Sequence, residues 1–98
     1  MRQGEVRPYL RGSARLRVVV VSGDAFNVRS APLIAPIYRL PDLPPVLVGL
    51  HDSDPLGGAV DLRELGAIPA DALGEPIGMI TGHTMVRVRA AVADILES

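Results

Sequence analysis

The chain has 98 residues, of which 48% are hydrophobic, so it is long and apolar enough for a single domain spanning 1–98. Its apolar runs are far shorter than the roughly 20 residues that a membrane span requires. No apolar segment follows residues 1–5 as in a signal peptide, and cysteine is absent. These observations exclude disulfides and thiolate metal sites and predict a cytoplasmic protein. We also expect no cofactor.

The net charge of −1 hides an uneven distribution of charge along the chain. Residues 1–39 hold seven arginines and two acids, a balance of +5, whereas residues 40–98 hold three arginines and nine acids, a balance of −6. Such a split indicates an anionic partner for the first half, unless the two halves interleave in the fold and their charges mix.

The first two strands are predicted at 5–10 and 15–21, with a loop at 11–14 between them. Pro8 lacks an N–H group and therefore fits only an edge or a bulge of a sheet. The run Val18–Val21 is β-branched throughout and contains no outward polar residue, which predicts a central strand that is covered on both faces.

A helical turn is expected at 24–28, with Asp24 or Ser22 as its N-cap. Pro36 predicts an edge or irregular position for the strand that contains it. The further strands are expected at 32–39, 46–51, 59–62 and 75–80, with 64–68 extending or following the third of these. An exposed loop at 40–45, a turn cluster at 52–58 and a helical turn at 69–73 separate them.

A C-terminal helix is predicted after Thr81, which is a good N-cap residue. Its apolar residues form a single stripe that we expect to pack on the sheet: Met85, Val88, Val92, Ile95 and Leu96. Many short strands, turns between them and one late helix predict a mostly β fold, a small twisted barrel with a C-terminal helix.

Metal and nucleophile motifs are weak in this sequence. The cluster 51–54 combines one histidine, two aspartates and a serine, but it lies among glycine and proline residues, where a turn is the better interpretation than a metal site. His83 is expected to be solvated, and Ser22 to be a turn or cap residue. No Gly-x-Ser-x-Gly sequence and no phosphate-binding loop is present.

Arginines near a tyrosine are the more informative constellation. Four arginines lie at predicted strand ends or loops: Arg11, Arg15, Arg17 and Arg39. Tyr38 is next to Arg39 in the sequence. Guanidinium groups bind phosphate in a bidentate manner and stabilise negative charge in a transition state, and RNA supplies its own nucleophile, the 2′-hydroxyl. Pairing of the second and third strands would bring these groups together. The alternative is a solvated basic rim without catalysis.

Several segments together resemble one known family. Residues 1–6, 18–27 and 33–37 are similar to the opening of MazF/PemK toxins, and residues 53–60, 73–78 and 84–85 resemble the second half of actinobacterial members. This resemblance implies an SH3-like barrel of the MazF/CcdB type and a homodimer. It also implies a metal-independent, sequence-specific endoribonuclease that cleaves single-stranded RNA, arrests growth and is neutralised by a cognate antitoxin.

The resemblance also places the candidate site residues. Leu16 stands where the family has its catalytic arginine, with an arginine on either side, and Tyr38 stands where the family has a threonine. We therefore expect Arg15, Arg17 and Tyr38 to be catalytic. RNA-binding residues are expected to be Arg7, Arg11 and Arg39.

Two interpretations of these departures stay open at the level of sequence. Nearby arginines are expected to lower the pKa of Tyr38, so that its hydroxyl acts as a base or hydrogen-bonds a phosphate; the alternative is a half-buried strand aromatic without chemistry. A catalytically degenerate relative, which binds DNA gyrase as CcdB does or only an antitoxin, is the competing function.

Overall fold

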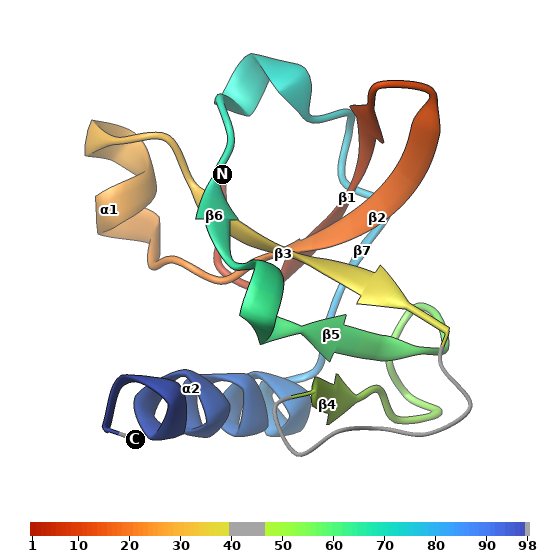
Figure 1. The fold of residues 1–98 in the computed structure, drawn as a ribbon, viewed down its shortest axis with the longest axis vertical. Coiled ribbons are helices and arrows are strands. Elements are labelled where there is room, and N and C mark those ends of the chain that lie inside the picture. The colour runs from red at the N-terminus through yellow and green to blue at the C-terminus, as the bar shows by residue number, and fades with distance from the viewer. Residues whose placement is uncertain (40–46, 98) are drawn as a thin grey trace.

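The computed structural model describes residues 1–39 and 47–97, in which an antiparallel sheet curls into a half-barrel that is closed on one side by a C-terminal helix (Figure 1). This confirms the predicted fold class. The strands are β1 (Glu5–Arg11), β2 (Ala14–Val20), β3 (Leu33–Tyr38), β4 (Leu47–Gly49), β5 (Ala59–Asp61), β6 (Gly66–Ala67) and β7 (Gly78–Met79). The helices are α1 (Asp24–Arg29) and α2 (Gly82–Glu97), with 3-10 turns η1 (Leu62–Glu64) and η2 (Ala70–Ala72).

The described strands of the second half are shorter than the sequence predicts. The expected strand at 46–51 is reduced to β4, the strand at 59–62 ends one residue early, and 75–80 contributes only β7. Glycine and proline residues around these segments limit ladder pairing to two or three residues. The loop expected at 40–45 lies outside the described residues, as does the first residue of the expected strand at 46–51.

The strand order is β4-β5-β3-β2-β1-β7, with β6 also pairing β3, so β2 lies inside the sheet. The loop predicted at 11–14 is smaller than expected, because Arg11 pairs with Ala14 and only Gly12 and Ser13 form the turn. Gly12 has φ of 61°, whereas no described non-glycine residue has a positive φ, which is the pattern of a tight II′ hairpin. The short turn holds Arg11 close to the start of β2.

Pro36 has an irregular position, one of the two alternatives that the sequence predicts, and not an edge position. β3 pairs with β2 on one side and with both β5 and β6 on the other. Among the described residues, β6 pairs with 33–34 and β5 with 37–38, so Pro36 lies in the interval where its missing N–H group interrupts no ladder. Pro8 meets its expectation, because β7 pairs with β1 only at Glu5 and Val6.

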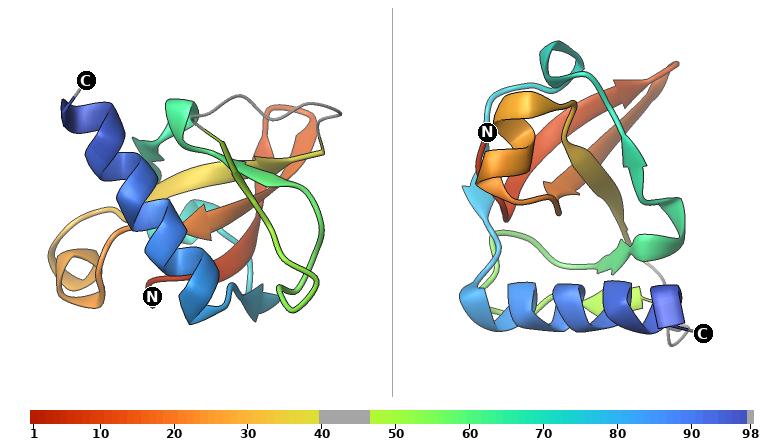
Figure 2. Two further views of the ribbon diagram at one scale, coloured as in Figure 1. Left: turned by 90° about the horizontal axis from the view of Figure 1, so that it is seen from below. Right: turned by 90° about the vertical axis from the view of Figure 1, so that its left-hand side faces the viewer.

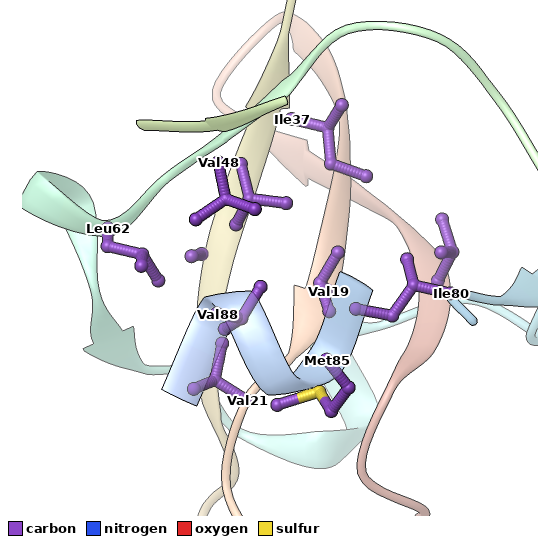
Figure 3. Packing of buried hydrophobic residues seen from close by; sticks show 11 residues of the cluster. Val19, Val21, Ile37, Val48, Leu62, Ile80, Met85 and Val88 are labelled. Carbon is purple, nitrogen blue, oxygen red and sulfur yellow. The ribbon is translucent and has the colours of Figure 1, made fainter. Parts of the chain in front are cut away.

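The valine run Val18–Val21 is buried as predicted, with exposed fractions of 0–9%. Its odd-numbered side chains pack with Met85 and Val88 of α2 (Figure 3). Its even-numbered side chains pack with Ile34 and Leu73 on the opposite face. Helix α2 and the segment around η2 therefore cover the two sides of the sheet, as Figure 2 shows.

Helix ends agree with the sequence only in part. The expected N-cap of α1 is wrong: Gly23 holds that position without a side-chain bond, Ser22 Oγ accepts from the Leu33 N–H (2.9 Å), and Asp24 Oδ1 accepts from the Gln3 N–H (2.7 Å). The Ser22 side chain thus contacts the start of β3, and Asp24 ties the start of α1 to the segment before β1. Thr81 caps α2 as predicted, because its Oγ1 accepts from the Thr84 N–H at 3.2 Å.

Among the described residues, the apolar stripe of α2 packs against the core from Met85 to Val92. Met85 and Val88 are buried and Val92 is half-buried, but Ile95 is 37% exposed and Leu96 is 80% exposed. The prediction that the whole stripe packs on the sheet is therefore wrong for its last turn, because within the described residues the helix runs past the elements that cover its first half.

Asp54 joins the turn at 51–54 to the start of α2, which confirms the turn interpretation of this cluster. Its Oδ2 accepts from the His51 N–H (2.7 Å) and the Thr84 hydroxyl (2.6 Å). Its Oδ1 accepts from the Thr81 N–H at 2.7 Å. Burial alone raises the pKa of Asp54, but the hydrogen bonds from Thr84, Thr81 and His51 outweigh it and lower the pKa.

Asp54→Ala is expected to destabilise the protein by about 2–4 kcal/mol, because buried donors lose a charged acceptor. Urea unfolding at pH 7 measures this loss, and Asp52→Ala, exposed in the same turn, is the control. Because the folded pKa of Asp54 is lowered, its stabilisation is complete above the unfolded pKa of about 3.9 and is lost as pH falls through the folded value. Equal stability of the two variants would contradict this role.

Candidate functional site

A cleft of about 300 Å³ opens where β2 begins and β3 ends. β2 and β3 pair there, with Arg17 opposite Ile37, so the two arginine clusters meet as predicted. The lining residues are Arg15, Leu16, Arg17, Ile37, Tyr38, Arg39, Leu56 and Gly57. Arg15 and Arg17 are two residues apart on one strand and therefore share one face of the sheet.

The cleft is cationic because its arginines lack acidic partners in the part of the chain that the structure describes. Arg15, Arg17 and Arg39 are exposed, and none of them forms an ion pair with a carboxylate within residues 1–39 and 47–97. A guanidinium group without a protein partner is available for a phosphate oxygen, with which it forms short, charge-assisted hydrogen bonds. The site can thus hold one or more phosphates of an anionic chain.

Tyr38 borders this cleft, but its hydroxyl lies among other charged groups. Successive strand residues point to opposite faces, so Tyr38 faces away from the side of Ile37. Arg11, at the end of β1, donates from Nη2 to the Tyr38 hydroxyl at 3.3 Å. The same guanidinium pairs through Nη1 with Glu64 Oε1 at 3.2 Å.

The expectation that arginines lower the pKa of Tyr38 is wrong. Burial of the phenol is the largest influence and raises its pKa, and the interaction with Glu64 raises it further. The hydrogen bond from Arg11 acts in the opposite direction but is outweighed. Tyr38 therefore stays protonated at neutral pH, and its hydroxyl has a proton to donate to a ligand but is not a base.

Comparison with families of known proteins matches residues 5–96 to the PemK-like, MazF-like toxins of type II toxin–antitoxin systems. The chain belongs to this family. Comparison with curated proteins gave no match for this sequence.

Solved structures of MazF-type proteins have the same fold. An endoribonuclease from a mycobacterial species, solved in complex with its cognate antitoxin, is 26% identical, with a TM-score of 0.91 over 99% of this chain and 95% of the other. A mycobacterial endoribonuclease solved without a named partner is 26% identical, with a TM-score of 0.86 over 99% and 91%. MazF from a MazE–MazF structure of Deinococcus radiodurans, at 17% identity, has a TM-score of 0.84 over 98% and 94%.

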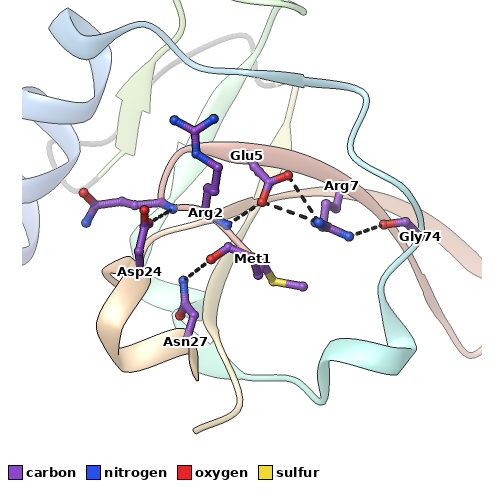
Figure 4. Close-up of polar contacts among 8 residues, drawn as sticks. Met1, Arg2, Glu5, Arg7, Asp24, Asn27 and Gly74 are labelled. Carbon is purple, nitrogen blue, oxygen red and sulfur yellow. Dashed lines mark hydrogen bonds and ion pairs between the residues drawn. The ribbon is translucent and has the colours of Figure 1, made fainter. Parts of the chain in front are cut away.

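Arg7 of this MazF-like toxin has a structural position. Its Nη2 pairs with Glu5 Oε2 at 3.2 Å and its Nη1 donates to the Gly74 carbonyl at 3.0 Å (Figure 4). Only 16% of its side chain is exposed, and Glu5 also accepts from the Arg2 N–H. The guanidinium of Arg7 holds the segment before β7 against β1, so we leave it out of the RNA site proposed below.

The two halves of the toxin, with their opposite charges, mix only in part. β1 pairs with β7, β3 pairs with β5 and β6, and the Arg11–Glu64 ion pair joins the halves directly. The second half also neutralises itself, because Asp61 binds Arg63 at 2.8 Å, which lowers the pKa of Asp61. The arginines of the cleft keep their charge for a ligand.

Within the described residues, His, Cys, Asp and Glu side chains nowhere gather in a group of three that could hold a metal ion. His51 Nδ1 lies 2.8 Å from Ser53 Oγ inside its turn, and His83 is exposed. None of the described helices is both long and apolar enough to cross a membrane.

Proposed function

We propose that this toxin is a metal-independent endoribonuclease that cleaves single-stranded RNA at specific sequences and thereby arrests translation and growth. The three arginines of the cleft, which have no carboxylate partner among the described residues, support this function most strongly. The fold that carries these arginines matches that of a mycobacterial endoribonuclease with a TM-score of 0.91. An anionic substrate and phosphoryl chemistry fit both observations.

Arg15 and Arg17 act on the scissile phosphate in this proposal. Fixed cationic donors stabilise the extra negative charge that the phosphate acquires when the 2′-hydroxyl attacks it. Tyr38 donates a hydrogen bond to a phosphate oxygen, and Arg39 binds a neighbouring phosphate from the end of β3. Arg11 contributes positive charge from the hairpin.

A second cleft, of about 390 Å³, provides a place for a base. Arg15 and Leu16 line both clefts, and the second continues to Tyr9 and Leu10 of β1. Nucleobases stack on aromatic rings and pack against apolar side chains, while guanidinium groups hold the backbone. RNA that crosses Arg15 would place phosphate in the cationic cleft and a base beside Tyr9. Because a base must be unpaired to enter the second cleft, we expect a preference for single strands.

The partners proposed are a second copy of this chain and a cognate antitoxin. The sheet ends in β4 and β7, strands of three and two residues whose edges a partner would cover. The 26%-identical mycobacterial endoribonuclease was solved with its antitoxin, and we expect this toxin to be neutralised in the same manner in the cytoplasm.

The purified toxin is therefore expected to sediment as a homodimer at micromolar concentration, at twice the chain mass of 10.4 kDa. Analytical ultracentrifugation over a range of concentrations measures this mass. A single species of 10.4 kDa at every concentration would contradict the homodimer.

Incubation of the purified protein with single-stranded RNA in the presence of EDTA tests the proposed activity. We expect discrete fragments with common end sequences, and an intact strand when the same RNA is annealed to its complement. RNA that stays whole under all conditions would favour the competing function, a catalytically inactive relative that binds a protein.

A further inference from the structure

The guanidinium of Arg11 joins the hydroxyl of Tyr38 to Glu64, and the three side chains come from distant parts of the sequence. Arg11 donates to the hydroxyl at 3.3 Å, and Glu64 binds the same guanidinium at 3.2 Å. Glu64 also contributes to the raised pKa of Tyr38. The side chains of Arg11 and Glu64 are 51% and 40% exposed, so the cluster is open to a ligand.

Each of the three residues is held by rigid local structure. Arg11 lies in the last pair of the tight hairpin. Glu64 ends η1, whose first turn is capped by the side chain of Asp61, which accepts from the Arg63 N–H at 3.0 Å. Gly58 approaches Tyr38 so closely that an added Cβ would lie 2.6 Å from the Tyr38 carbonyl oxygen, which fixes the backbone of β3 at this point.

Attack by a 2′-hydroxyl requires a group that accepts its proton, and the described lining of the cationic cleft does not contain one. Its lining consists of arginines, apolar side chains, a glycine and Tyr38, whose raised pKa keeps it protonated. Arginine is never deprotonated at neutral pH. Among the described residues, Glu64 is the carboxylate that Arg11 links to Tyr38, a residue of the cleft lining, although Glu64 does not itself line the cleft.

We propose that Glu64 is the general base of RNA cleavage, with Tyr38 and Arg11 adding contacts to the attacked phosphate that Arg15 and Arg17 hold; this inference rests on the proposed function. The Glu64 carboxylate takes the proton of the 2′-hydroxyl as the 2′-oxygen bonds to phosphorus. The bond from phosphorus to the 5′-oxygen breaks, and that oxygen takes a proton from solvent water. Glu64 then returns its proton to the hydroxide formed, leaving a 2′,3′-cyclic phosphate and a 5′-hydroxyl.

Single-turnover cleavage by Glu64→Gln tests this role. We expect a 10²–10⁴-fold lower rate, as is typical for the loss of a general base, with RNA affinity retained. Glu75→Gln, at another exposed position, is the control and is expected to cleave at the parent rate. Glu64→Ala is expected to regain part of its activity in added formate, because a free carboxylate fills the space of the missing side chain.

The outcomes separate this inference from the proposed function. If Glu64→Gln cleaves as fast as the parent, the base is another group, although the toxin is an endoribonuclease. If the loss of rate equals a loss of RNA affinity and formate restores nothing, Glu64 only positions Arg11, and the inference is overturned. If the parent itself leaves every RNA intact, both the inference and the proposed function are wrong.

Discussion

Replacing Val20 by aspartate is expected to unfold the toxin. Val20 is fully buried in the central strand, where it packs with Ile34 and Leu73. A carboxylate in this position would have no partner among these apolar side chains, and an unpaired buried charge is among the most destabilising changes known. Since the whole stability of a small domain is about 5–15 kcal/mol, we expect no cooperative thermal transition by circular dichroism.

Val28→Asp is the matched control, because it introduces the same charge on α1, where Val28 is 86% exposed. The free energy of unfolding of this variant is expected to lie within about 0.5 kcal/mol of that of the parent, as is usual for surface substitutions. If Val20→Asp melted like Val28→Asp, the assignment of β2 as the buried central strand would be incorrect.

Removing both charges from β2 is expected to have the largest effect on activity. In the double variant Arg15→Gln, Arg17→Gln, cleavage should fall by at least about 10²–10³-fold, the loss typical for one preorganised donor at a developing negative charge. The dependence of RNA affinity on salt should weaken as well, because each phosphate contact on a single strand contributes about 0.7 to the slope of log K against log salt. Single-turnover rates and filter binding at several salt concentrations measure both quantities.

The control for net charge is the double variant Arg29→Gln, Arg87→Gln, which removes two exposed arginines from α1 and α2. This control is expected to cleave at the parent rate, and its RNA affinity is expected to keep more of the parent's salt dependence than that of the β2 double variant. Equal losses in the two double variants would show that overall charge, and not the cleft, governs RNA binding. If the double variant of β2 still cleaved at the full rate, the catalytic role would have to be assigned to Arg11 instead.

The elements that the sequence predicted well are those with a local signal. The run Val18–Val21 is β-branched and uninterrupted, so its burial on both faces follows from the residues themselves. Apolar residues at helical spacing follow Thr81, and Thr81 is the N-cap of α2. For Pro36 the sequence left an edge and an irregular position open, because the choice depends on where β5 and β6 end on the far side of β3, which no local pattern reveals.

Only those residues of the candidate site that lie in strands with a local sequence signal could be predicted. Arg15, Arg17 and Tyr38 lie in β2 and β3, two strands that the sequence identified, and pairing of these strands brings them to one cleft. Glu64 was missed, because it lies in a 3-10 turn and reaches Arg11 only through the pairing of β3 with β5. The pKa of Tyr38 was predicted in the wrong direction, since burial and Glu64 are visible only in the folded chain.

Sequencing of RNA 5′ ends from bacterial cells that express the toxin tests its function most directly. The expected result is growth arrest together with new 5′-hydroxyl ends that share a short sequence, absent from cells that express the double variant Arg15→Gln, Arg17→Gln. Growth arrest with unchanged RNA ends would contradict the endoribonuclease and point to a protein target such as DNA gyrase.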